Sequence, residues 1–473
     1  MTPPDSTQAR TSQTVLPPAG GSPLRPGVIF AVVALALLMS TLDQTIVATA
    51  LDTLQHDLHA PITWVSWTMT VYSLGLLLAL PLAGRLSEQF GRRRVFLVSV
   101  AVFTTASLCC GLAPNIYVLV ALRFLQAMGG AGFTPSATGI IVDYLGPSRD
   151  RALGMFAALF SIGAMIGPIF GGLFVTYWSW RGIFFVNVPI GIALAVLCVR
   201  FIPADPPRER GTREPFDLVG MIEIGLGVLG LMVALNALSD GGGALRTPEF
   251  LAPAVVAVLG LVAFAHHIRW SPHPFIAPRF VMGHGFGAVN IVNAGAGVAQ
   301  GLVALIPLYA VTRYHMAVLD SGTLLTAEGA AVIVMSTVAV GVLRRTGYRL
   351  PILLGLVITA IGLFTLSVSP RGMSPYAWLA VAAAILGLGT GWLSPASRNA
   401  GLQLAPESSP TLAALRTMSI QIGLIAAIAI TTAIISGATH PGLAHAHAYL
   451  AWAVFILLLT PIVTRVPEHR GAW

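Results

Sequence analysis

The stretch GRLSEQFGRRR, residues 84–94, joins two apolar runs at residues 64–83 and 95–113. Each run has about the 20 mostly apolar residues that a helix needs to cross a bilayer. The connection is short and carries four arginines, and short loops rich in arginine stay on the cytoplasmic side of a membrane. A glycine at each end of the stretch lets the flanking helices approach closely. The stretch therefore predicts a helical protein that crosses the membrane repeatedly.

The composition of the 473-residue chain agrees with a lipid environment. Apolar residues make up 56% and charged residues 9%, whereas soluble domains carry about 25% charged residues. The 26 basic residues are all arginines and flank the apolar runs, so the net charge of +8 indicates membrane orientation rather than nucleic-acid binding. The three cysteines all lie in apolar runs, which excludes a disulfide-stabilised scaffold.

Fourteen apolar runs are predicted to span the membrane. Breaks at charged, Gly and Pro residues place them at 28–51, 64–83, 95–113, 116–143, 151–176, 181–203, 217–238, 250–269, 286–311, 318–343, 350–368, 375–397, 411–436 and 447–466. With the N-terminus inside, 20 arginines fall on the cytoplasmic side, 4 fall outside and 2 lie within runs. This asymmetry predicts that both termini are cytoplasmic.

A faint internal repeat indicates how the spans are grouped. The segment Gly341–Gly347 is a shorter echo of the stretch at 84–94 and lies between the tenth and eleventh runs. Two such connections predict an all-α integral membrane fold of two pseudo-symmetric six-helix bundles with an inserted helix pair. The predicted segments are a disordered cytoplasmic tail (1–27), the first bundle (28–204), the linker with inserted helices seven and eight (205–270), the second bundle (271–466) and a cytoplasmic tail (467–473).

The stretch at 84–94 also carries the candidate gating residues Gly84, Glu88, Gly91 and Arg92. Glu88 can pair with an arginine or cap a helix, so we predict a latch between bundles that opens when the protein changes state. A plain positively charged loop is the alternative. The pattern resembles the cytoplasmic signature of the major facilitator superfamily, which usually has Asp in place of Glu88.

A second gating motif lies in the fifth run, where Gly163, Gly167 and Gly171 are four residues apart and Pro168 lies between them. On a helix this spacing makes one flat stripe for close helix contact, and Pro168 bends the helix. Packing alone is the simpler interpretation. The pattern resembles the antiporter motif of the same superfamily, which implies export and a position at the interface between bundles.

Two charged residues in the first and fourth runs are predicted to couple protons to transport. Asp43 lies among apolar residues, where a charge is costly in lipid and a functional role is expected. Asp43 and Arg123 each lie about 12 Å from the outer ends of their runs, so they can share one depth. Snorkelling of Arg123 to the surface is the alternative. The segment around Asp43 resembles the span-one signature of the fourteen-helix drug:proton antiporter branch, and Arg123 with Gln126 resembles the superfamily's proton-transfer motif. The superfamily fold makes these two spans neighbours, which implies an ion pair.

Three further charged residues lie within apolar runs. Glu328 is near the middle of the tenth run, where it could bind a cationic substrate, carry a proton or hydrogen-bond to a neighbouring helix. Glu223 and Arg416 lie nearer the ends of their runs, where snorkelling explains them more simply.

No catalytic, metal or cofactor site is predicted. His440, His445 and His447 are expected in the last outer loop, and no Cys or acid accompanies them as a metal site would require. The chain contains no lysine and therefore no phosphate-binding loop, which argues against ATP-driven transport.

These patterns and the resemblance together predict a proton-coupled antiporter, not an enzyme, that exports amphipathic drugs or antibiotics by alternating access. Asp43, Gln126 and Glu328 are expected to contact substrate, and Asp43, Arg123 and Glu328 to couple the proton. The expected partners are a small amphipathic substrate, protons and the lipid of the bacterial inner membrane, around a monomer. The alternatives are an exporter of one endogenous metabolite, or a receptor or lipid-handling protein with the same fold.

Overall fold

A computed structural model describes residues 26–145, 149–205, 217–237, 246–272, 274, 278–283, 285–370, 372–404 and 409–468. Most of both predicted tails lies outside these residues, as do residues 206–216 and 238–245 of the predicted segment 205–270. Within them the chain forms helices joined by short turns, and no strand. The prediction of an all-α fold is therefore confirmed.

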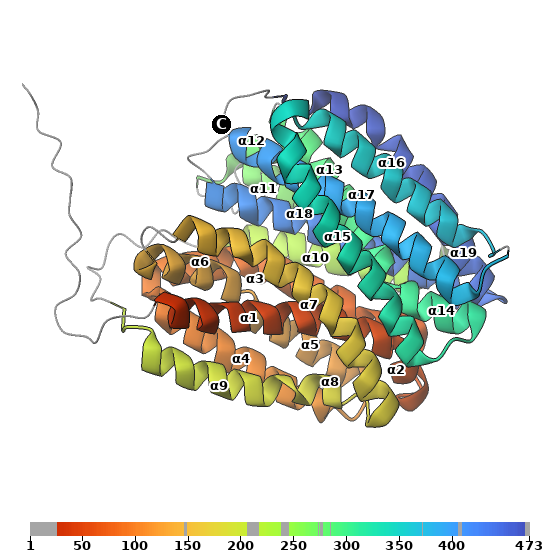
Figure 1. The fold of residues 1–473 in the computed structure, drawn as a ribbon, viewed down its shortest axis with the longest axis horizontal. Coiled ribbons are helices and arrows are strands. Elements are labelled where there is room, and N and C mark those ends of the chain that lie inside the picture. Colours follow the sequence, from red (N-terminus) through yellow and green to blue (C-terminus); the bar gives the residue numbers. More distant parts are fainter. Residues whose placement is uncertain are drawn as a thin grey trace, which may run out of the picture.

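The first bundle forms the lower part of Figure 1, coloured red to yellow. Its six segments are α1 (Pro26–Ile46) continued by η1 (Val47–Ala50) and α2 (Leu51–Asp57), α3 (Ile62–Phe90), α4 (Arg92–Gly111), α5 (Ile116–Gly130) with α6 (Phe133–Tyr144), α7 (Arg149–Tyr177), and α8 (Gly182–Phe185) with α9 (Asn187–Phe201). The first, fourth and sixth segments are thus each divided into shorter helices.

The second bundle forms the upper part of Figure 1, coloured green to blue. The inserted pair α10 (Leu218–Ala237) and α11 (Pro248–Trp270) precedes it. Its elements are the short α12 (Pro278–Met282), then α13 (Phe286–Ala304) with α14 (Ile306–Tyr314), α15 (Val318–Thr346), α16 (Arg349–Ser367), α17 (Pro375–Leu404), α18 (Ser409–Ser436), and α19 (Pro441–Leu458) with η6 (Thr460–Arg465). The helix α10 contacts both α3 and α18, so the inserted pair lies along the seam between the bundles.

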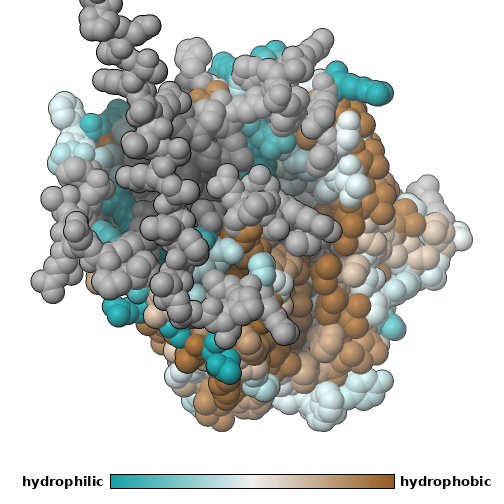
Figure 2. All heavy atoms as spheres, turned by 60° about the vertical axis from the view of Figure 1, so that its left-hand side comes forward, coloured by the Kyte–Doolittle hydropathy of each residue, from teal (hydrophilic) through white to brown (hydrophobic). Residues whose placement is uncertain are grey.

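Fourteen helical segments account for the fourteen predicted spans. In the described part of the chain, 13 are long and apolar enough to cross a membrane. The other is α7, a helix of 29 residues whose described apolar part, Ile162–Tyr177, is shorter. Apolar residues, shown in brown in Figure 2, cover a large part of one face of the molecule. In α11, only 17% of the most apolar stretch of the helix is buried. The protein is therefore a multi-pass membrane protein.

Four predicted span boundaries are wrong by six or seven residues. The helix α3 continues to Phe90 rather than to residue 83, so much of the connection predicted at 84–94 is helical, and α17 continues to Leu404 rather than to residue 397. The first segment continues to Asp57, and the last begins at Pro441 rather than at residue 447. His445 and His447 therefore lie on α19 and not in a loop. Alternating alanines, which favour helix, surround both residues, and His445 is buried against the ring of Tyr449 at a centroid distance of 4.8 Å.

The two bundles share a core of buried apolar side chains. We call the side on which α1 begins the terminal face and the side on which α2 and α14 lie the distal face. Near the distal face, Ser66 Oγ of α3 donates a hydrogen bond to Thr432 Oγ1 of α18 over 3.1 Å. One cluster of buried apolar side chains there includes Val47 and Leu51 of the first bundle and Leu305 of the second. This packing joins the two bundles between Asp43 and the distal face.

Candidate functional site

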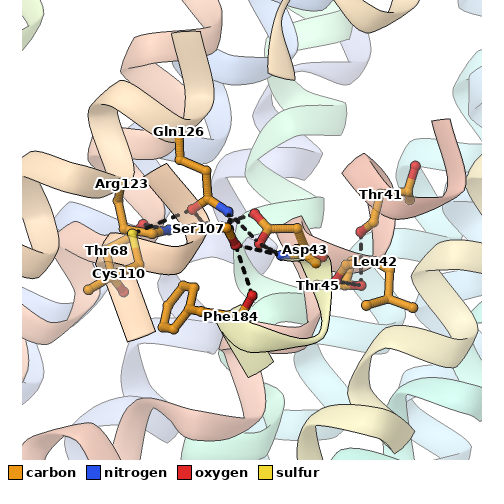
Figure 3. A network of polar contacts seen from close by, with 11 residues as sticks. Thr41, Leu42, Asp43, Thr45, Thr68, Ser107, Cys110, Arg123, Gln126 and Phe184 are labelled. Carbon is orange, nitrogen blue, oxygen red and sulfur yellow. Dashed lines mark hydrogen bonds and ion pairs between the residues drawn. The ribbon is translucent and has the colours of Figure 1, made fainter. Parts of the chain in front are cut away.

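Asp43 and Arg123 form an ion pair inside the first bundle (Figure 3). Arg123 Nη1 lies 2.6 Å from Asp43 Oδ2, and the two side chains are 1% and 0% exposed for Arg123 and Asp43 respectively. The ion pair expected between these two spans is therefore present. Because each charge neutralises the other, the pair can exist in a region that neither water nor lipid headgroups reach.

The Arg123 guanidinium has further partners on three sides. Its Nε donates to the backbone oxygen of Thr68 over 3.1 Å, and Nη1 also donates to Gln126 Oε1 over 2.7 Å. Its Cζ lies 4.1 Å from the centroid of the Tyr72 ring, which is a cation–π distance. Arg123 and Gln126 are three residues apart on α5 and so share one helix face. The arginine is held by α3 and α5 and does not extend to the surface, which rules out the snorkelling alternative for this conformation.

The second carboxylate oxygen of Asp43 accepts two amide hydrogen bonds. Gln126 Nε2 donates over 2.9 Å, and Asn187 Nδ2, from the first residue of α9, donates over 2.8 Å. The same two nitrogens donate to Ser107 Oγ of α4 over 3.0 and 2.9 Å. Ser107 Oγ in turn donates to the backbone oxygen of Phe184 over 3.0 Å. The carboxylate of the first segment is thus bonded to the fourth and sixth segments, and the second and third segments hold its partners.

Sequence reasoning did not assign a role to Ser107 or Asn187. Both are wholly buried, and each is a polar residue within an apolar run. That signal was available for Asn187, which is the only amide among the apolar residues of the sixth run. Their convergence on Asp43 was not available, because three separate segments must pack before the contacts exist.

The network is closed to a substrate in this conformation. Asp43 and Gln126 are both 0% exposed, and their polar atoms are engaged with each other and with the bundle. All of their described partners belong to the first bundle. The direct substrate contact expected of these two residues is therefore not possible without a change of conformation.

The glycine stripe of the fifth segment faces α1. A Cβ atom at any of the three glycines would collide with a threonine of the first segment, in α1 or in η1. The pairs are Gly163 with Thr41, Gly167 with Thr45, and Gly171 with Thr49. Both sets repeat every four residues, so the first segment and α7 pack in register along one face. Asp43, two residues from both Thr41 and Thr45, points from the opposite side of α1 toward α5 and α9.

The helix α7 also contacts the second bundle. A Cβ at Gly322 of α15 would lie 2.7 Å from the backbone oxygen of Pro168, and a Cβ at Gly172 would lie 3.1 Å from Leu319 Cα. The glycine stripe and Pro168 therefore lie in the part of α7 that packs against α1 on one side and against α15 on the other. This is the interface position that the resemblance implies.

The turn after α3 is built around Gly91. Its φ of +101° is a conformation that favours glycine, and a Cβ there would collide with the Asp205 carboxylate. That carboxylate accepts hydrogen bonds from the backbone N–H groups of Arg93 over 3.0 Å and Arg94 over 2.9 Å. Asp205, which follows α9, therefore caps the N-terminus of α4, a role that sequence reasoning missed.

The other predicted latch residues have different surroundings. Arg92 donates to the backbone oxygen of Gly139 and forms an ion pair of 2.5 Å with Asp143, both on α6 of the same bundle. A Cβ at Gly84 would meet only Pro135 Cβ at 3.9 Å, so the close approach predicted at Gly84 is absent in this conformation. The side chain of Glu88 lies outside the described part of the structure.

Glu328 is not part of the Asp43 network. It lies partly exposed on α15, and its carboxylate has no hydrogen bond or ion pair within the described residues. Its backbone oxygen lies against Gly387 of α17, and the next residue, Gly329, faces Met165 of α7. The structure therefore brings Asp43, Arg123 and Gln126 together and leaves Glu328 on the second bundle, close to the contact with α7.

The other two charged candidates are also placed within helices. Arg416 is half-buried and its Nη2 donates to Ser394 Oγ over 3.0 Å, so it binds α17 rather than extending to the surface. Glu223 has one carboxylate oxygen buried without a hydrogen-bond partner among the described residues. Neither contacts the Asp43 network.

Comparison with known proteins agrees with this fold. Residues 33–310 match the family described as the Major Facilitator Superfamily. The chain is 30% identical over 397 residues to a "Multidrug resistance protein B homolog" of Mycobacterium tuberculosis, covering 83% of this chain and 73% of that protein. It is 30% identical over 476 residues to a "Methylenomycin A resistance protein" of Streptomyces coelicolor, covering 98% and 97%. A solved peptide transporter POT in complex with sulfate has the same fold, with a TM-score of 0.69, 16% identity and coverage of 93% and 96%.

Proposed function

The chain belongs to the major facilitator superfamily, and from this premise we propose that it is a proton-coupled exporter of amphipathic drugs or antibiotics. Export of such compounds is supported by relatives named for multidrug and methylenomycin resistance. The arginine asymmetry supports a protein of the bacterial inner membrane with both termini in the cytoplasm. The terminal face would then be the cytoplasmic face.

The observation that carries the proposal is the buried ion pair between Asp43 and Arg123. Asp43 belongs to α1, and α1 packs against α7. A proton on Asp43 removes one charge of the pair and leaves Arg123 buried with a weaker partner. The state that best accommodates the protonated form is then favoured. Since α1 packs in register on α7, and α7 contacts α15, a movement of α1 is transmitted to the second bundle. Proton uptake thereby biases the alternation between inward and outward access.

Substrate recognition in this conformation is proposed to lie outside the Asp43 network. Asp43 and Gln126 are enclosed, so we propose that they contact substrate only in another state of the cycle and act here by coupling. Glu328 is partly exposed and unpaired within the described residues, and it lies near the contact between the bundles. It is the side chain that we propose meets a cationic substrate or a second proton. No resident cofactor is proposed, and the protein is proposed to act as a monomer.

Transport in inverted membrane vesicles tests the proposal. Vesicles are energised, a pH-sensitive dye reports the proton gradient, and lipophilic cations and common antibiotics are added in turn. We expect wild-type protein to release protons on addition of substrate, and Asp43→Asn to abolish this release. Asp320→Asn makes the same change at an exposed position in the first turn of α15 and should behave as wild type.

The outcomes separate the proposal from its alternatives. A response to a single compound of the panel would indicate a dedicated exporter. Binding of compounds without any proton release from wild-type vesicles would contradict coupled transport and indicate a receptor or lipid-handling protein. Normal proton release from Asp43→Asn would leave transport intact but remove Asp43 from the mechanism.

A further inference from the structure

The partners of the Asp43 carboxylate share one property: each of them donates. Arg123 Nη1 donates to Oδ2, and Gln126 Nε2 and Asn187 Nδ2 donate to Oδ1. This arrangement fits the charged carboxylate. A protonated Asp43 is itself a donor, so its O–H needs an acceptor that these three groups do not present in this conformation.

One buried acceptor next to Asp43 is vacant. Asn187 Oδ1 is buried and has no hydrogen-bond partner among the described residues. The corresponding oxygen of Gln126 is occupied, because it accepts from Arg123 Nη1 over 2.7 Å and lies 3.7 Å from Cys110 Sγ. Turning the Gln126 amide would break the contact with Arg123. Turning the Asn187 amide gives up the two hydrogen bonds that Nδ2 donates to Asp43 and Ser107, and none made by its oxygen.

We propose that Asn187 is the positioning residue that senses the protonation state of Asp43, a role that rests on the proposed coupling function of Asp43. When Asp43 gains a proton, the Asn187 amide rotates so that Oδ1 takes the place of Nδ2. The new O–H of Asp43 then donates to Asn187 Oδ1, and no proton leaves either residue. In the charged form the amide rotates back and Nδ2 donates again.

The rotation also changes the hydrogen bond of Ser107. In the charged form Ser107 Oγ accepts from Asn187 Nδ2 and donates to the backbone oxygen of Phe184. After the rotation Ser107 faces an acceptor, so its O–H turns from Phe184 to Asn187 Oδ1. The Phe184 carbonyl, which lies where the sixth segment divides into α8 and α9, loses its side-chain donor. Protonation of Asp43 thereby loosens α4 from the junction between α8 and α9.

Few other groups near Asp43 can titrate. The charged or titratable side chains that face it are Arg123 of α5, Tyr72 of α3 and Cys110 of α4. The junction of α8 and α9 presents the Phe184 carbonyl and the neutral Asn187. The pH dependence of the network therefore reports on Asp43.

Two replacements of similar size test the role. Asn187→Leu can neither donate nor accept, and Asn187→Asp presents an acceptor that can share a proton with Asp43. Proton release per substrate is measured in inverted vesicles across a pH series. We expect Asn187→Leu to lose proton release at least tenfold while still binding substrate. We expect Asn187→Asp to retain it, with the pH of half-maximal release about one unit or more higher, because two adjacent carboxylates resist double ionisation.

A control variant and the order of proton release in the two Asn187 variants complete the test. Asn293 of α13 is also a buried asparagine whose Oδ1 lacks a described partner, and Asn293→Leu should keep the wild-type pH profile. A residue that only packs, or only donates to Asp43, would tolerate Leu better than Asp, and that ranking would overturn the inference. If Asp43→Asn exchanges protons as wild type does, the coupling function itself fails. Loss in Asp43→Asn with a normal Asn187→Leu rejects the role of Asn187 alone.

Discussion

Removal of the Arg123 guanidinium should destabilise the protein by much more than the loss of a surface charge would. In Arg123→Leu the hydrogen bonds to Asp43, Gln126 and the Thr68 carbonyl are lost together. Asp43 remains, wholly buried, with a negative charge that only two amide donors still stabilise. Breaking one partner out of a buried ion pair costs about 3–5 kcal/mol. We expect a loss of stability in this range at neutral pH.

A double-mutant cycle isolates the pair from the packing. Asp43→Asn with Arg123→Leu removes both charges, so the unpaired carboxylate no longer exists. We expect the double variant to be more stable than Arg123→Leu, with a coupling energy of about 2–3 kcal/mol. The Asp43→Asn variant alone should lose less than Arg123→Leu, since Arg123 keeps the Tyr72 ring at 4.1 Å and its hydrogen bonds to Gln126 and Thr68.

The pH dependence gives a second signature of the same variant. Without Arg123, the charged form of Asp43 is unfavourable in the fold but not in the unfolded chain, so stability falls as pH rises. Acidification adds a proton to the buried carboxylate and should reduce the deficit of Arg123→Leu. Thermal unfolding of purified protein in one detergent, followed by tryptophan fluorescence at neutral and acidic pH, measures both effects. Strictly additive losses, or an equal deficit at both pH values, would refute the idea that the pair is held by its mutual charge.

Four further experiments test separate features of the protein. Gly91→Ala should lose about 1–2 kcal/mol of unfolding free energy from its positive φ, and more from the collision with Asp205, whereas Gly372→Ala, at φ +72° in open space, should show only the backbone effect in the same unfolding assay. Asp205→Ala should lower stability by about 0.5–2 kcal/mol through loss of the cap on α4, and an unchanged melting temperature would contradict that cap. Gly167→Leu should stop transport in vesicles through its collision with α1, while Gly341→Leu, at an open helical position, should transport normally. Reporter enzymes fused to each terminus should be active only in the cytoplasm, and activity of either on the outside would reject the orientation.

The fold was largely accessible from the sequence because lipid imposes a simple constraint. Apolar runs of a fixed minimum length must be helices, so their number and order could be read without knowing any contact. The first and last residues of the helices were harder to predict. The helix α19 begins before residue 447, because its first turns carry histidines, which a hydropathy pattern assigns to a loop. The expected ion pair followed from depth and from the resemblance, and Asp43 and Arg123 do meet.

Other features depended on the tertiary structure. The hydrogen bonds from Asn187 to Asp43 and to Ser107, and the capping of α4 by Asp205, each join residues more than 60 positions apart, and no local pattern encodes such contacts. The structure also separated Glu328 from Asp43, although both were predicted to couple the proton, and left room beside Gly84, where a close approach of helices was predicted. The sequence alone determined which segments enter the membrane, because hydrophobicity is a property of each segment. Which polar groups meet inside it was decided only by packing, because a buried carboxylate is stabilised by whichever donors neighbouring helices bring within hydrogen-bonding distance.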